Sequence, residues 1–92
     1  MKKNKYELII QNTIDLHGLS LGEALIAVES FITESQQKKH TMICIITGKG
    51  IHSPSGPVLK KNIQIFLREQ GISFRDAKIQ EGGSGALIVT LS

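Results

Sequence analysis

The chain of 92 residues has little cysteine, few aromatic residues and no long hydrophobic run. Its single cysteine, Cys44, cannot form an internal disulfide, which points to a reducing compartment. No stretch approaches the roughly 18 apolar residues of a membrane helix, and the basic start lacks the uncharged segment and cleavage site of a secretion signal. We therefore expect a cytoplasmic protein that has no membrane partner.

Aromatic residues make up only 4% of the chain, and tryptophan is absent. The three phenylalanines lie among aliphatic residues, as core residues would, so platforms for stacking nucleic-acid bases have little support. The length leaves room for one compact domain and excludes a multi-domain machine. We expect residues 1–6 to form a basic flexible tail and residues 7–92 to form a single domain.

The net charge of +3 is unevenly distributed along the chain. Lys2, Lys3 and Lys5 account for the whole surplus, so the body of the protein is neutral. Within that body, residues 6–34 carry only acids, whereas residues 48–75 carry basic residues and one acid. The body is therefore polarised, and an anionic partner would bind to its positive part.

Hydrophobic periodicity predicts the order strand, helix, strand, helix, strand, strand. The predicted strands cover residues 7–17, 42–46, 72–79 and 86–91. Ser20 and Glu23 have the spacing of a capping box at the first helix, and Pro57 begins the second, with Gly71 past its end. The predicted apolar side of the second helix carries Val58, Ile63, Phe66 and Leu67. The fold class is α/β, a two-layer βαβαββ sandwich with a mixed four-stranded sheet and two helices.

This order of elements predicts where the functional groups lie. Helical crossovers make the first three strands parallel, so the segments after residues 17, 47 and 79 emerge at one carboxyl edge of the sheet. The short last connection favours a hairpin. Glycine-dependent segments at 17–18, 48–50 and 82–85 would meet at this edge, where glycines let backbone amides approach an anion. We predict a phosphate-binding edge.

Asp15 and His17 stand two residues apart at the end of a strand, so their side chains project from the same face. The carboxylate could orient the imidazole as a general base or acid for phosphodiester cleavage. Alternatively, Asp15 caps the turn and His17 bonds to backbone in a structural role. An isolated Asp-x-His does not decide between the two.

The candidate phosphate-binding residues lie in the loop after the second strand, at the start of the second helix and in the last glycine-rich segment. They are Gly48, Lys49, Gly50, His52, Ser53, Lys60, Lys61, Gly83 and Gly85. The spacing differs from that of a nucleotide-triphosphate P-loop. The alternatives are a tight turn with a solvated Lys49 and a helix cap formed by His52 and Ser53. Lysines in the first turns oppose the helix dipole, which favours an anionic partner.

A metal site on Asp15, His17 and His52 is disfavoured, because no spacing typical of a structural zinc site is present. The sequence requires no cofactor, and a divalent cation is compatible with it. The residues do not define an oligomeric state.

Three ordered motifs together resemble the Smr (small MutS-related) domain. They read IDLHGL at 14–19, ITGKG at 46–50 and GGSGALIVTL at 82–91. Their order and distances match over nearly the whole domain, which is far more specific than any one motif. The resemblance implies a compact α/β sandwich like the C-terminal domain of bacterial translation initiation factor three. It also implies nucleic-acid binding and, in several members, endonuclease activity that nicks DNA or cuts RNA, including messages on stalled ribosomes.

The resemblance extends to individual positions. Asp15 and His17 match the family's Asp-x-His, with Ile14 in place of the usual leucine. The second motif is often His-Gly-x-Gly, and Thr47 occupies the histidine position here. The family includes a Thr-Gly-x-Gly subset that commonly carries a His-Ser pair, and His52 and Ser53 match that pair here.

Two hypotheses follow from the motifs. In the first, the domain is an endonuclease acting on RNA or structured DNA, in which Asp15 orients His17 for proton transfer. Lys49, His52 and amides of the glycine loops would stabilise the charge that develops on the phosphate. In the second, Thr47 in place of histidine marks a non-catalytic module that binds nucleic acid or the ribosome.

Overall fold

The computed structural model describes residues 9–48, 56–78 and 85–91, so the tail predicted at residues 1–6 lies outside it. The elements are β1 (Asn12–Asp15), α1 (Leu21–Gln37), β2 (Met42–Ile46), α2 (Gly56–Glu69), β3 (Ser73–Asp76) and β4 (Ala86–Thr90). The predicted α/β class and element order are confirmed. Among the described residues, neither helix is long and apolar enough to cross a membrane.

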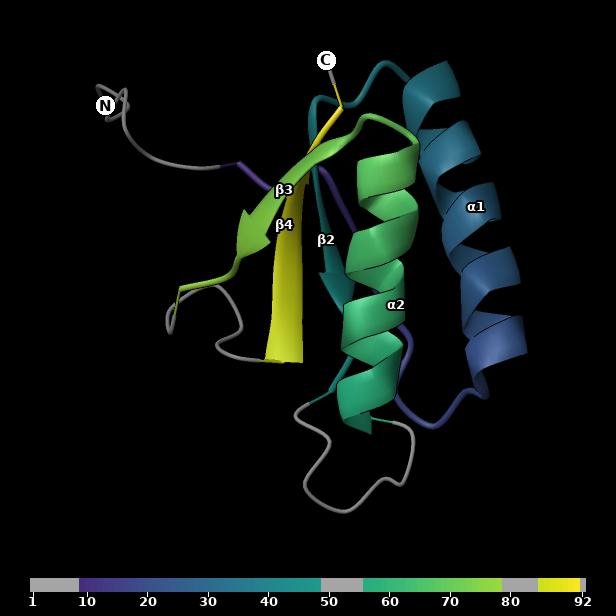
Figure 1. Ribbon diagram of the computed structural model, residues 1–92. Helices are drawn as coiled ribbons and strands as arrows, with labels where there is room; N and C mark the ends of the chain where they lie inside the picture. The colour runs from purple at the N-terminus through teal and green to yellow at the C-terminus, as the bar shows by residue number, and fades with distance from the viewer. Residues whose placement is uncertain (1–8, 49–55, 79–84, 92) are drawn as a thin grey trace.

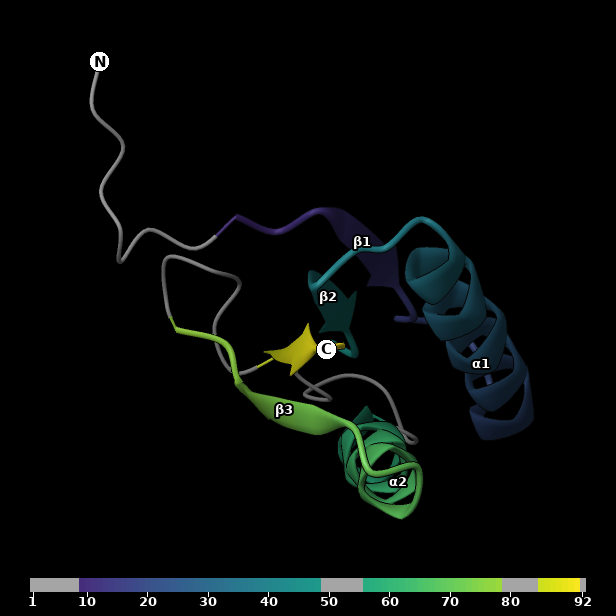
Figure 2. The same ribbon diagram turned by 90° about the horizontal axis from the view of Figure 1, so that it is seen from above.

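The four strands form one mixed sheet in the order β1-β2-β4-β3. β1 pairs in parallel with β2, and β4 pairs antiparallel with both β2 and β3. The first three strands therefore run in one direction, and β3 and β4 are antiparallel neighbours, as predicted. Both helices pack on the same face of this sheet (Figures 1 and 2). The carboxyl ends of β1 and β2 and the first turns of both helices consequently lie at one end of the molecule.

The core lies mainly between the sheet and the helices. Its fully buried members include Leu16, Val28, Ile43, Ile45, Leu59, Ile63, Leu67, Leu87 and Val89. A smaller buried cluster formed by Cys44, Ala77, Ala86 and Ile88 includes the residues that alternate with this core along β2 and β4. The two central strands are therefore buried on both faces, which is why β2 is a continuous apolar run in the sequence.

β1 is shorter than the predicted strand because Gln11 interrupts it. The side-chain oxygen of Gln11 accepts hydrogen bonds from the backbone amides of Thr41, at 2.6 Å, and Met42, at 3.0 Å. The amide of Gln11 in turn donates to the Met42 carbonyl. Gln11 thus joins the chain before β1 to the start of β2, and regular pairing begins at Asn12.

The predicted capping box at the start of α1 is confirmed. The Ser20 hydroxyl accepts a hydrogen bond from the Glu23 amide, and the Glu23 carboxylate accepts one from the Ser20 amide. At the other end the amide of Lys39 donates to Gln36 and that of His40 donates to Ser35, which is the Schellman pattern of helix termination. Lys39 supplies the left-handed conformation, with φ +60°, that glycine usually supplies there.

α2 begins one residue before the predicted Pro57 and ends as predicted. Gly71 has φ +71°, and the Ile72 amide donates to Leu67 in a second Schellman pattern. The predicted apolar side was wrong at Val58, whose residue surface is 50% exposed. Its neighbour Leu59 is buried instead, because the helix phase set by Ile63 and the following turn directs position 59 inward.

Candidate functional site

The carboxyl end of β1 holds Asp15 and His17 apart from the core. Leu16 is fully buried, and its amide donates to the Ile46 carbonyl at 2.7 Å, which extends the pairing of β1 with β2. Because side chains alternate along an extended strand, burying Leu16 turns both of its neighbours outward. A turn follows, closed by the Leu19 amide on the Leu16 carbonyl, with Gly18 at φ +85°. His17 is thus presented on a tight turn whose ends are fixed.

Asp15 and His17 form a hydrogen-bonded pair, as the spacing predicted. The ring nitrogen Nδ1 of His17 lies 2.6 Å from Oδ1 of Asp15, and the same oxygen accepts the His17 backbone amide at 3.1 Å. Two contacts from one residue restrict both the backbone and the ring. The histidine side chain is nevertheless 73% exposed and that of the aspartate 49% exposed, so the pair is open to a large substrate.

The pair keeps Asp15 ionised. The His17 imidazole hydrogen bond lowers the pKa of the Asp15 carboxyl below its ordinary value of 3.8, and the His17 amide acts in the same direction. An ionised carboxylate only accepts hydrogen bonds, so Nδ1 is the protonated nitrogen when the ring is neutral. The other ring nitrogen, Nε2, is then an unprotonated acceptor, which is the state that a general base needs.

Gly48, two residues after the end of β2, lies close to this pair. Its φ is +84°, and a Cβ built on it would lie 3.3 Å from the Cβ of His17. Its amide donates to the Gly85 carbonyl at 3.0 Å. Gly48 therefore lets the backbone pass close to the Cβ of His17. Because the Gly48 amide already donates to Gly85, it is not free to bind a ligand in this structure. What Gly48 contributes to the site is the space that a larger side chain would fill.

Thr47 occupies a position whose role the sequence did not reveal. The residue is 2% exposed, and its amide donates to the Gly85 carbonyl at 2.8 Å. The Thr47 hydroxyl lies 3.3 Å from the same carbonyl and 3.4 Å from that of Gly48. Thr47 thus joins the end of β2 to the residue before β4 and faces inward, away from a substrate. The only sequence signal is a small hydroxyl residue placed directly between a buried strand and a glycine.

The two lysines of α2 are placed differently from each other. Nζ of Lys60 lies 2.9 Å from Oδ1 of Asp76, so this half-buried side chain links α2 to β3. Lys61 is exposed. Within the described part of α2, Lys61 is therefore the better placed of the two for an external anion, and phosphate binding by either lysine stays a prediction.

The structure brings together Asp15, His17, Gly48 and Gly85 among the predicted site residues, through the contacts given above. The other predicted loop residues, Lys49, Gly50, His52, Ser53 and Gly83, lie outside the described residues. Within residues 9–48, 56–78 and 85–91, no three His, Cys, Asp or Glu side chains are grouped so as to hold a metal ion. Among the described residues, the functional groups at this edge are the Asp15 carboxylate and the His17 imidazole.

Comparison with known proteins places most of the chain in one family. The model of the Smr domain family matches residues 14–92. Endonuclease NBR9 of Saccharomyces cerevisiae is 36% identical over 81 residues, covering 87% of this chain and 32% of that protein. Ribosome rescue factor SmrB of Vibrio cholerae is 30% identical over 81 residues, covering 86% of this chain and 41% of its own length. The chain thus spans less than half of either relative.

Solved structures show the same fold. The Smr domain of Thermus thermophilus MutS2 superposes with a TM-score of 0.78 at 31% identity, covering 88% of this chain and 98% of that one. YdaL, a stand-alone small MutS-related protein from Escherichia coli, gives a TM-score of 0.78 at 27% identity, over 86% of this chain and 63% of YdaL. The similarity to the Thermus structure therefore covers nearly all of that domain.

Proposed function

Because this chain belongs to the Smr domain family, we propose that it is an endonuclease that cleaves phosphodiester bonds in RNA or structured DNA. The observation that carries the proposal is the exposed Asp15–His17 pair, with its 2.6 Å contact, at the end of β1. The proposed partner is nucleic acid, free or on the ribosome, and the proposed location is the cytoplasm. No resident cofactor enters the proposal, and a divalent cation remains compatible with it.

The proposed chemistry is general acid–base catalysis by His17. Nε2 takes a proton from the attacking oxygen, and the resulting imidazolium gives a proton to the leaving oxygen. Asp15 holds the ring through Nδ1 and stabilises the imidazolium, because its carboxylate stays ionised. Glycine at position 48 leaves the space beside the Cβ of His17 free, where a larger residue would crowd it. The histidine supplies the proton transfer, and its neighbours hold it in position.

Charge stabilisation is assigned to the positive side of the same edge. Lys49, His52 and the glycine-loop amides keep the phosphate-binding role that the sequence predicts for them. The described structure adds exposed Lys61 near the start of α2, whose first turn contains no acidic residue. No acidic side chain of that described turn offsets the positive end of the helix dipole, which suits a negatively charged ligand. The support is electrostatic and does not distinguish RNA from DNA.

Cleavage of fluorescent RNA and of branched DNA by the wild type and by His17→Ala tests the proposal. We expect His17→Ala to lower the rate by about 100-fold or more and Asp15→Asn by less, since a positioned general base contributes about 10² to 10⁴. His40→Ala is the matched control, because it removes another imidazole at the opposite end of α1 and should leave the rate unchanged. Equal residual cleavage by wild type and His17→Ala would exclude the assignment.

A second function is favoured by the buried Thr47 hydroxyl, since an imidazole is absent where the family usually has one. The domain would then bind nucleic acid or the ribosome without cutting, in line with its similarity to a ribosome rescue factor. Such binding should be strongly salt dependent and should weaken in Lys49→Ala or after removal of residues 1–5. Tight binding with no product after long incubation supports this function, and cleavage that depends on His17 excludes it.

A further inference from the structure

A pocket lies between the two helices, toward their carboxyl ends. Its volume is about 200 Å³, and its lining includes Gln36 in the last turn of α1 and Gln70, directly after α2. The helices lie side by side and run in the same direction along one face of the sheet (Figures 1 and 2). Because the Asp15–His17 pair lies near their amino ends, the pocket is separate from the candidate site.

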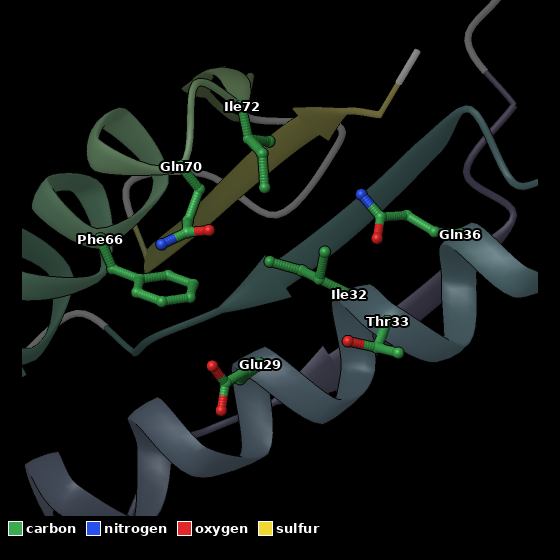
Figure 3. A pocket seen from close by; sticks show the side chains of 7 residues that line it. All are labelled: Glu29, Ile32, Thr33, Gln36, Phe66, Gln70 and Ile72. Carbon is green, nitrogen blue, oxygen red and sulfur yellow. The ribbon is translucent and has the colours of Figure 1, made fainter.

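The most buried residues of the pocket are apolar. Ile32 of α1 is 5% exposed, and Phe66 and Ile72 are half-buried. Figure 3 shows the side chains of Phe66 and Ile32 extending from their two helices toward each other. These three residues form a surface on which an aliphatic chain loses contact with water, which favours its binding.

The exposed residues around the opening are polar. They are Glu29, Thr33 and Gln36 of α1 and Gln70 after α2, and Glu29 is the one charged residue among the described residues of the lining. In the described part of the chain, the Glu29 carboxylate makes no ion pair, and the side-chain amides of Gln36 and Gln70 have no hydrogen-bond partner. The opening therefore presents a carboxylate and two amide oxygens to a ligand.

Basic residues close in sequence to the lining make contacts elsewhere. Nζ of Lys38 lies 3.2 Å from a carboxylate oxygen of Glu34, and Cζ of Arg68 lies 5.5 Å from the centroid of the Phe74 ring. The carboxyl ends of two helices that run in the same direction add negative partial charge at this end of the molecule. The charge at the pocket therefore favours a cation.

We infer that this pocket binds a small aliphatic amine in its protonated form. An alkylammonium carries three N–H donors and no acceptor, so it suits an opening lined by a carboxylate and amide oxygens. It also suits the face of the Phe66 ring, because an aromatic ring attracts a cation within about 6 Å of its centroid. The ammonium group pairs with Glu29, and the alkyl chain lies on Ile32 and Ile72.

The size of the pocket favours a free small molecule. A cavity of about 150 Å³ is enough for a benzene-sized ligand, so this pocket suits an amine of about six to eight non-hydrogen atoms. Nucleic acid is disfavoured by the same negative charge that attracts the amine. The inference uses no property of Asp15 or His17 and holds whether or not the domain cleaves nucleic acid.

Titration of the full chain with hexylammonium chloride, followed by ¹H–¹⁵N NMR spectra, tests the inference. A ligand this small is expected to bind with a Kd of about 1 mM. The side-chain amide signals of Gln36 and Gln70 should shift together and saturate, while the backbone signal of His17 stays in place. Hexanol and hexanoate carry the same chain without the positive charge and should bind about tenfold more weakly or less.

Three variants assign the binding to the proposed groups. Glu29→Gln removes the charge and keeps the shape, so the Kd for hexylammonium should rise about tenfold while that for hexanol stays unchanged. Phe66→Leu should raise the Kd for hexylammonium about threefold, because the ring face is lost. Glu69→Gln is the matched control, since it removes the same charge from the end of α2 at a residue outside the pocket lining, and its Kd should equal that of the wild type.

Four outcomes overturn the inference. They are the absence of a saturable shift up to about 50 mM hexylammonium, binding of hexanol as tight as that of hexylammonium, an equal loss in Glu29→Gln and Glu69→Gln, and tighter binding of a capped Gly-Lys-Gly peptide. The last outcome would assign the pocket to a lysine side chain of a protein instead of a free amine. Circular dichroism melting curves ensure that each variant is folded before it is scored, and Phe66→Met replaces Phe66→Leu if that variant melts early.

Discussion

The two helices differ in how the residues at each of their ends satisfy the backbone and the helix dipole. α1 completes its own start, where Ser20 and Glu23 exchange hydrogen bonds of 3.0 and 3.2 Å. α2 has no acidic residue in its first turn and carries Lys60 and Lys61 shortly afterwards, against its own dipole. Both starts lie at the end of the molecule that holds Asp15 and His17. Within the described residues, α2 is thus the helix whose first turn supplies no acidic side chain to its own positive end, which suits an anion.

At the far ends of the helices, α2 has the residues that suit a helix end, and α1 has one that does not. α2 stops on Gly71, which adopts φ +71° without strain, and carries Arg68 in its last turn. α1 stops on Lys39 at φ +60°, a conformation that costs an ordinary residue energy. In the described part of the chain, each helix therefore has residues that suit the helix at one end and residues that oppose it at the other. The unfavourable end of α2 is at the candidate site, and that of α1 is remote from it.

Among variants that test the difference between the two helices, the largest effect is expected from reversing the charge near the start of α2. Lys61→Glu should raise the Kd for nucleic acid about tenfold and reduce the salt dependence by about one counterion. The same change should slightly stabilise the fold, because an acid there suits the helix dipole. Fluorescence anisotropy over a salt series measures the first effect and urea unfolding the second.

The control for Lys61→Glu is Lys38→Glu, which makes the same charge change at the far end of α1. Lys38→Glu should leave the affinity for nucleic acid unchanged and should remove the ion pair that Lys38 forms with Glu34. If Lys38→Glu weakens binding as much as Lys61→Glu, the loss of affinity does not depend on where the charge lies, and the start of α2 is not a preferred site for the anion.

Breaking the closed start of α1 should cost stability. Ser20→Ala removes the acceptor for the Glu23 amide and should lower the free energy of unfolding by about 1 kcal/mol. Ser20→Asp, which keeps an acceptor at the cap, should recover most of the loss. Urea unfolding at neutral pH measures both variants, and equal stability of Ser20→Ala and wild type would contradict the role of the cap.

The far ends of the helices should respond in opposite directions to glycine. Gly71→Ala places a side chain at φ +71° and should cost about 1 kcal/mol, although the site has open space for a Cβ. Lys39→Gly relieves the equivalent conformation and should gain up to about 1 kcal/mol. Thermal melts of both variants make the comparison. The same sign for both would show that backbone conformation does not control these ends.

The smallest effect concerns Asp15 and pH. Because the folded-state pKa of Asp15 lies below 3.8, its pairing with His17 adds stability above that pH, and this is lost as the pH falls through the lower folded value. Half-exposure of the side chain keeps the contribution small. Unfolding curves of wild type and Asp15→Asn should converge on acidification. A constant difference down to about pH 2.5 would contradict the linkage.

Much of the fold and the central pair could be predicted because they depend on local pattern. The capping box depends on two residues three apart, and the Asp15–His17 contact on two residues two apart. Val58 was misplaced because the phase of a helix near its start is set by tertiary burial. The pairing of Lys60 with Asp76 and the inward hydroxyl of Thr47 also escaped prediction, since their partners lie far along the chain.

The sequence by itself determined the order of elements, the helix start at Ser20 and the pair of groups at the end of β1, because each is governed by periodicity or by neighbours within one turn. Only the tertiary structure decided which groups surround that pair. β2 pairs with β1 on one side and β4 on the other, which brings Gly48 close to the Cβ of His17 and ties Thr47 to Gly85. Contacts between segments so distant in sequence arise from sheet pairing, which local pattern does not encode.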